Sequence, residues 1–217
     1  TSQIQFDQEF GNTFFGTGNT LVNAQTLLEL RAIPPKRYLE GGDCLIYKEP
    51  IKNHEYILVA DVSKGRGQDY SSFSLINIIY KYANVYNKAY CIVESNDQGS
   101  VVCNGLYYDL EYENVHVESA VKANAVGVDI NRKSKRLGCS ALKDLLENNK
   151  MVVVDEQTIL EISTFEAKGQ TYQAAVGNHD DLVMNLVMFG YFVSSSYFSN
   201  LTDINIKDMI FKQKLKE

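Results

Sequence analysis

An apolar stretch that ends in a single carboxylate constrains the fold of this chain most strongly. Residues 56–60 read YILVA, a short run rich in β-branched residues that predicts a buried strand. Asp61 follows directly, residues 63–69 form a polar turn with two glycines, and residues 73–78 form a second strand-like run. This pattern predicts a hairpin whose first strand ends in an acid. Because an unpaired carboxylate is costly near a core, we expect Asp61 to be paired or to bind a metal ion.

Strands and helices alternate along the remainder of the chain. A second short apolar run, residues 91–94, also ends in an acid, Glu94. Strands are further predicted over residues 44–48, 115–117, 151–154 and 161–168, and helices over residues 23–31, 79–88, 101–110, 140–149, 182–191 and 201–217. This alternation predicts a layered α/β fold, and the expected hairpin makes its central sheet mixed.

The composition predicts one domain with an additional arm. The chain has 217 residues, of which 45% are hydrophobic, enough to form a substantial core. Residues 1–22 contain four phenylalanines separated by glycines and polar residues, and aromatic side chains of this kind need burial. We therefore expect an aromatic-rich N-terminal arm over residues 1–50, packed on a domain over residues 51–217. Because the chain does not begin with Met, we expect it to be part of a longer protein.

Cysteine spacing and hydropathy indicate the compartment. The four cysteines are widely spaced and form no CxxC pair, so we expect reduced and mostly buried thiols rather than disulfides or a zinc site. The sequence contains no apolar run of about 18 residues and no signal-peptide pattern, so we expect no membrane partner.

The acids at the ends of these elements suggest a metal site. Asp61 and Glu94 end two predicted strands, and Asp180 and Asp181 open a late apolar helix. Carboxylate oxygens are hard ligands suited to Mg²⁺ or Mn²⁺, and two such ions can bridge a phosphate. Acids that end strands or begin helices are also common as purely structural residues, so both interpretations stay open. His179, next to these acids, is either a supporting partner or base, or a structural residue at the helix start.

A basic segment stands out in a protein of net charge -6. Four cations lie within six residues of a predicted loop: Arg132, Lys133, Lys135 and Arg136. A solvated loop would explain them, but phosphate contact is favoured because this local charge opposes the global one. Lys64 and Arg66, close to Asp61, would extend the same surface. The glycines around them do not match GxxxxGK[ST], so nucleotide binding is not favoured.

These residues lie in stretches that together resemble one family. The stretches are residues 10–20 (FGNTFFGTGNT), 58–70 (LVADVSKGRGQDY), 92–99 (IVESNDQG), 107–115 (YYDLEYENV), 133–144 (KSKRLGCSALKD) and 179–190 (HDDLVMNLVMFG). They resemble the nuclease domain of the large terminase, the DNA-packaging motor, of T-even-like tailed bacteriophages. The resemblance covers most of the chain.

The resemblance implies an RNase H-like fold and a metal-dependent endodeoxyribonuclease that cuts concatemeric double-stranded DNA during packaging, with Mg²⁺ or Mn²⁺ as cofactor. Its acidic triad corresponds to Asp61, Glu94 and one of Asp180 and Asp181. We prefer Asp181, because an acid inside the first helical turn projects predictably whereas Asp180 suits the cap position. The implied partners are double-stranded DNA, an ATPase domain in the full-length chain, the portal and the small terminase subunit, in the cytoplasm of the infected host cell.

The resemblance also leaves two expectations open. An RNase H-like sheet would have a third strand between residues 73–78 and the first helix, so either this chain lacks that strand or the natural chain has further residues near Ile76 and Tyr80. The sequence has no GxxxxGK[ST], so we expect the ATPase half to be absent and this chain alone not to translocate DNA. The alternative function is a non-catalytic docking domain that binds the portal or the small subunit through its arm and its last helix.

Overall fold

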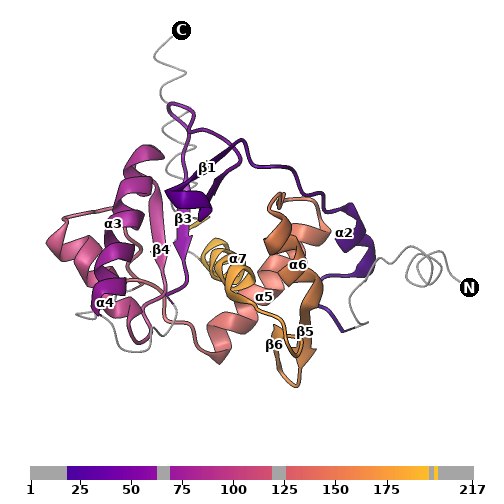
Figure 1. Cartoon of the computed structure of the whole chain (residues 1–217). Coiled ribbons are helices and arrows are strands. Elements are labelled where there is room, and N and C mark those ends of the chain that lie inside the picture. The colour runs from indigo at the N-terminus through magenta and orange to yellow at the C-terminus, as the bar shows by residue number, and fades with distance from the viewer. Residues whose placement is uncertain (1–18, 63–68, 119–125, 196–197, 200–217) are drawn as a thin grey trace, which may run out of the picture.

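The computed structural model describes residues 19–62, 69–118, 126–195 and 198–199, with the backbone alone for residues 69–73 (Figure 1). Residues 1–18 of the predicted N-terminal arm, the predicted last helix, and Lys64 and Arg66 lie outside the described residues. The elements are α2 (Ala24–Glu29), β1 (Arg37–Leu39), η1 (Glu40–Gly42), β2 (Cys44–Ile46), β3 (Ile57–Ala60), α3 (Asp69–Val85), β4 (Tyr90–Val93), α4 (Gly99–Asn104), the π-helix η2 (Gly105–Asp109), α5 (Arg132–Glu147), α6 (Glu156–Thr164), β5 (Phe165–Lys168), β6 (Thr171–Ala174) and α7 (Asp181–Val193).

Two parallel strands form the part of the fold that positions the acids. β3 and β4 pair in register from Ile57 opposite Tyr90 to Ala60 opposite Val93. β4 is almost fully buried, and single bridges extend the pairing to Val115 and, past the end of β4, to Val128. β1–β2 and β5–β6 are separate antiparallel pairs. Because parallel strands end at the same edge, the residues that follow β3 and β4 are neighbours in space.

Helix α7 joins the two main groups of core residues. One group packs α3, α4 and η2 against β3 and β4, with Cys91, Val93 and Leu106 fully buried. The other packs α5, α6 and β5 against α7, with Leu142 and Phe165 fully buried. Figure 1 shows α7 in the middle of the molecule, and it contacts both β3 and α5. The start of α7 is therefore held between the strands and the other helices.

Helices α5 and α7 approach each other closely at two glycines. A Cβ atom on Gly138 would lie 2.2 Å from the carbonyl oxygen of Val187. A Cβ atom on Gly190 would lie 2.6 Å from the carbonyl oxygen of Gly138. No real side chain tolerates such distances to backbone, so glycine at both positions sets the separation of the two helices.

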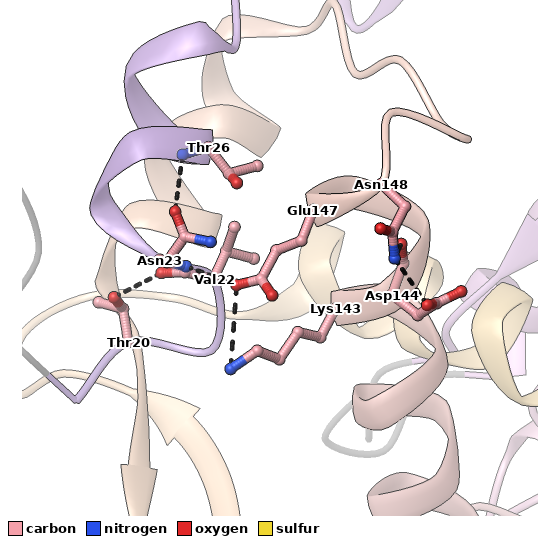
Figure 2. A network of polar contacts seen from close by, with 8 residues as sticks. All are labelled: Thr20, Val22, Asn23, Thr26, Lys143, Asp144, Glu147 and Asn148. Carbon is pink, nitrogen blue, oxygen red and sulfur yellow. Dashed lines mark hydrogen bonds and ion pairs between the residues drawn. The ribbon is translucent and has the colours of Figure 1, made fainter.

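A polar network fixes the segment around α2 to the end of α5 (Figure 2). The Asn23 side chain accepts a hydrogen bond from the Thr26 N–H at 2.9 Å and so caps α2. The Asn23 N–H donates to the Glu147 carboxylate at 3.0 Å, and Lys143 lies 3.8 Å from the same carboxylate. Leu21, just before α2, is buried in the core formed with α5 and α7. The segment before α2 thus packs against α5 and α7.

The predicted hairpin is wrong. Residues 73–78 lie inside α3, and β3 pairs in parallel with β4 instead of with a following strand. Ile76, Ile79 and Ala83 recur at helical spacing and pack against the core around β4, so tertiary packing selects the helix over the strand preference of the local residues. α3 is continuous from residue 76 to residue 80, where the third strand was expected.

Three further predictions need correction. Residues 151–154 form no strand, because no described strand pairs with them, although Val153 is buried in the core while Val152 is 83% exposed. Residues 156–164 form α6, capped by Asp155, and the strand predicted over 161–168 begins only at Phe165. The basic segment is not a loop, because Asn131 caps α5 and the helix starts at Arg132.

The other element predictions agree with the structure. α2 and β2 fall within the predicted ranges, α4 with η2 and α7 overlap theirs, and Glu94 directly follows β4 as expected. In the strand predicted over residues 115–117, only isolated bridges form, at Val115 and Val117. All four cysteines are free, and three of them are buried. Within the described residues, no helix is long and apolar enough to cross a membrane.

Candidate functional site

The two strand-end acids lie side by side at one edge of the β3–β4 pair. Ala60 and Val93 are partners in the register, so Asp61 and Glu94 each follow the last paired residue. The Glu94 N–H continues the ladder by donating to the Ala60 carbonyl at 3.0 Å. The parallel pairing that the sequence did not predict is what brings these two carboxyl groups together.

The proximity of the two acids changes the ionisation of Glu94. The pKa of the Glu94 carboxyl is raised to about 8, chiefly by burial and then by the hydrogen bond and negative charge of Asp61. The Asn96 amide opposes this shift by donating to the Glu94 carboxylate at 2.9 Å. Two carboxyl groups this close can both be negative only with a positive charge between them, which a cation would supply.

Asn185 connects the end of β3 to the start of α7. Its side-chain oxygen accepts a hydrogen bond from the Asp61 N–H at 2.8 Å, and its amide nitrogen donates to the Asp181 carbonyl at 3.3 Å. Asp181 is the first residue of α7 and is exposed. Because residues i and i+4 share a helix face, Asp181 lies on the face of α7 that meets Asp61.

Asp180 is directed elsewhere. Its carboxylate accepts a hydrogen bond from the Ala174 N–H of β6 at 3.3 Å and lies 4.0 Å from the Lys135 ammonium group on α5. It holds the cap position of α7 without capping the helix through its side chain. These contacts favour Asp181 over Asp180 as the third acid, and the assignment stays a prediction. His179, just before them, is exposed.

The donor set fits a divalent cation only in part. Asp61 and Glu94 offer oxygen ligands at one point, which suits Mg²⁺ or Mn²⁺. Among the described residues, no three His, Cys, Asp or Glu side chains gather closely enough to hold a metal ion. The carboxylate of Asp181 is therefore not gathered with this pair, although its residue lies on the helix face that meets Asp61.

The predicted basic residues divide into two groups. Arg132, Lys133 and Arg136 are exposed on the first turns of α5. Lys135 is half-buried, with its ammonium group 5.5 Å from the centre of the Phe165 ring and next to Asp180. Lys135 thus faces the interior, whereas the other three cations face solvent.

The exposed basic residues border a depression next to the β5–β6 turn. Arg136 and Lys143 of α5 line a pocket of about 320 Å³ together with Gln170 and Tyr172. Arg132 lines a smaller neighbouring pocket with Lys168. The hairpin therefore adds one cation, Lys168, to the surface that begins on α5.

Three residues that sequence reasoning did not single out support the acids: Asn96, Asn185 and Glu161. Asn96 donates to both Glu94 and the Ile130 carbonyl, while Glu161 binds the first turn of α7. A signal was available for Asn185, because it stands one helical turn after Asp181. The other two depend on contacts that only the fold reveals.

The mixed α/β arrangement, with an acid at the end of each of two neighbouring parallel strands, is that of an RNase H-like domain. Comparison with known families agrees, since residues 71–189 match the terminase RNaseH-like domain family. The chain belongs to this family. The predicted fold class and the terminase resemblance are thereby confirmed, while the narrower likeness to T-even-like phages stays a prediction.

Solved structures show the same fold. The large terminase nuclease from the thermophilic phage G20c is 17% identical, with a TM-score of 0.56 over 78% of this chain and 96% of that chain. A structure of that nuclease with bound magnesium is 18% identical, with a TM-score of 0.60 over 81% of this chain and 97% of that chain. At this identity the likeness establishes the architecture.

Proposed function

We propose that this domain is a divalent-metal-dependent endonuclease that cuts concatemeric double-stranded viral DNA during genome packaging. The observation that carries the proposal is the pair of acids, Asp61 and Glu94, at adjacent strand ends in a member of the terminase RNaseH-like family. A related nuclease has been solved with magnesium, which supports Mg²⁺ as the cofactor.

The residues would divide the work as follows. Asp61 and Glu94 would hold Mg²⁺ or Mn²⁺, with Asp181 as the third carboxylate at the start of α7. When bound, the metal would activate water and offset charge on the phosphodiester. Asn185 would keep the Asp61 backbone and α7 in place, and Asn96 would orient the Glu94 carboxylate.

The DNA would lie along the exposed cations of α5. Arg132, Lys133 and Arg136 offer phosphate contacts without an evident reader of base edges, so sequence preference would be weak. Lys64 and Arg66 would extend this surface. Lys135 contributes less than predicted because its charge is turned toward Asp180.

The wider context follows from the family. In the full-length chain we expect an ATPase domain, with the portal and small terminase subunit as partners, in the cytoplasm of the infected bacterium. The alternative function, a non-catalytic docking domain, would be favoured if Asp61, Glu94 and Asp181 bound no metal.

The decisive test is Asp61→Asn, which keeps the side-chain shape and removes the charge. We expect loss of plasmid cleavage in Mg²⁺ and of Mn²⁺ binding by calorimetry, with an unchanged circular dichroism spectrum. Asp109→Asn, an exposed acid at the end of η2, is the matched control and should behave as the parent. Near-normal cleavage by Asp61→Asn would refute the proposed site.

A second experiment tests the DNA surface. Replacing Arg132, Lys133 and Arg136 together with Ala should weaken DNA binding and reduce the slope of log K against log salt by about 3, one for each lost phosphate contact. The control removes three exposed lysines elsewhere in the chain: Lys36, Lys48 and Lys52. Equal salt slopes for the two triple variants would show that the α5 cations do not contact phosphate.

A further inference from the structure

A buried carboxylate from α6 lies against the beginning of α7. The Glu161 side chain accepts hydrogen bonds from the Leu182 N–H at 2.8 Å and from the Val183 N–H at 3.1 Å. Glu161 is only 5% exposed. Among the described residues, no Lys, Arg or His forms an ion pair with it.

These contacts replace the usual cap of the helix. The first N–H groups of a helix have no partner within it, and the residue at the cap position usually supplies one. Asp180 holds that position, but its carboxylate binds Ala174 and Lys135 instead. Glu161 supplies the missing acceptor from another helix, and the positive end of the α7 dipole compensates its buried charge.

We propose that Glu161 is a positioning residue for the acidic site, because its carboxylate fixes the first turn of α7 and thereby the place of Asp181. This inference rests on the proposed nuclease function. The bonded N–H groups belong to the two residues directly after Asp181, so any movement of that turn moves the Asp181 backbone as well.

Geometry distinguishes positioning from simple stabilisation. A local Ser or Asp cap would satisfy the same N–H groups without burying a charge. A cap from α6 does more, since it ties two helices together at the turn that carries Asp181. Asn185 provides the tie to β3 one turn later. Together Glu161 and Asn185 hold the start of α7 from two sides.

The test compares Glu161→Ala, Glu161→Asp and Glu161→Gln with the parent domain. Ala removes the acceptor, Asp keeps the charge but withdraws it by one methylene, and Gln keeps an acceptor at the same reach. We expect Ala and Asp to reduce kcat by about 10–100-fold and to weaken Mn²⁺ binding in calorimetry, with KM for DNA nearly unchanged. Gln should stay within about 10-fold of the parent. Amide exchange of Leu182 and Val183 should become faster in Ala and Asp.

A control that destabilises the same helix but keeps the hydrogen bonds to α7 is available next to Glu161. Ile162 points into the core, and Ile162→Val removes one methyl group there. It should lower thermal stability and leave Mn²⁺ affinity and kcat unchanged. If Glu161→Ala does not fold, the comparison of Glu161→Asp with Glu161→Gln decides. A positioning role requires Glu161→Gln to keep a higher kcat and Mn²⁺ affinity than Glu161→Asp.

The outcomes separate the two hypotheses. A parent domain that neither cleaves DNA nor binds Mn²⁺ would overturn the proposed function itself. A parent that does both, with Ala and Asp variants matching the Ile162→Val control in metal affinity and kcat, would overturn the role of Glu161 alone. Equal or reversed order of Gln and Asp would overturn it too.

Discussion

Replacing Gly138 by Ala should separate α5 from α7. The new Cβ atom would lie 2.2 Å from the Val187 carbonyl oxygen, about 1.2 Å short of the 3.4 Å at which ordinary van der Waals contact begins. It would also lie 2.8 Å from a Val187 side-chain carbon. Because one of these atoms is backbone, the helices themselves must move.

Two opposing effects set the magnitude. Alanine in place of glycine inside a helix contributes about 1 kcal/mol of stability. Overpacking a tight interface typically costs about 1–3 kcal/mol, and a backbone clash of this depth belongs at the upper end. We therefore expect the free energy of unfolding to fall by about 2 kcal/mol. For a domain of this size that corresponds to a decrease in Tm of about 4–8 °C.

Chemical denaturation followed by circular dichroism measures the loss, and the Mg²⁺-dependent cleavage assay reports on the site. Gly105→Ala is the control, because its Cβ would meet only the flexible Ile76 side chain. That variant should stay within about 1 kcal/mol of the parent. If Gly138→Ala were as stable as the parent while folding to the same structure, the close packing of α5 on α7 would be refuted.

Two further predictions concern α5 and the buried histidine. Asn131→Ala should lower the free energy of unfolding by about 1 kcal/mol in denaturant titrations, because Asn131 accepts hydrogen bonds from two N–H groups at the start of α5; an unchanged midpoint would contradict the capping role. Burial lowers the pKa of His116 below 6.5, against the opposing Glu118 charge, while Tyr90 bonds its ring at 3.0 Å. The unfolded chain therefore binds the proton more readily than the folded one. The contribution of His116 to the free energy of unfolding is fully present above pH 6.5 and is lost as pH falls toward the folded-state pKa. Unfolding curves of the parent should show this decline and those of His116→Gln a weaker one; parallel curves would exclude His116 as its source.

The sequence predicts the acid-bearing strand ends because each is a local signal. A short β-branched run followed by one acid occurs at Asp61 and again at Glu94. Burial follows for β4, whereas β3 is only half-buried and Ile57 is 38% exposed. This local pattern does not predict which strand pairs with β3. Residues 73–78 carry the composition of a strand, and only the packing of Ile76 and Ile79 against β4 makes them helical.

The basic segment shows a different gap between sequence and structure. The sequence predicts a loop around these four cations, yet the Asn131 cap and the reciprocal Ser134 contact start a helix there. A helix directs its side chains by position, so Lys135 turns inward to Asp180 while Arg132 and Arg136 remain outside. Charge density along the sequence predicts a basic surface but cannot say which of its members reaches solvent.

The two halves of the proposed site depend on different kinds of structure. Asp61 and Glu94 are placed by strand register, which is rigid and short-range, so small changes elsewhere should leave them together. Asp181 is placed by the docking of a helix, through Glu161 at its first turn, Asn185 one turn later and Gly138 against its middle. Each of these contacts involves a different element, so the position of the third acid is the part of the site most sensitive to mutation. Substitutions that move α7 should therefore displace Asp181 before they separate Asp61 from Glu94.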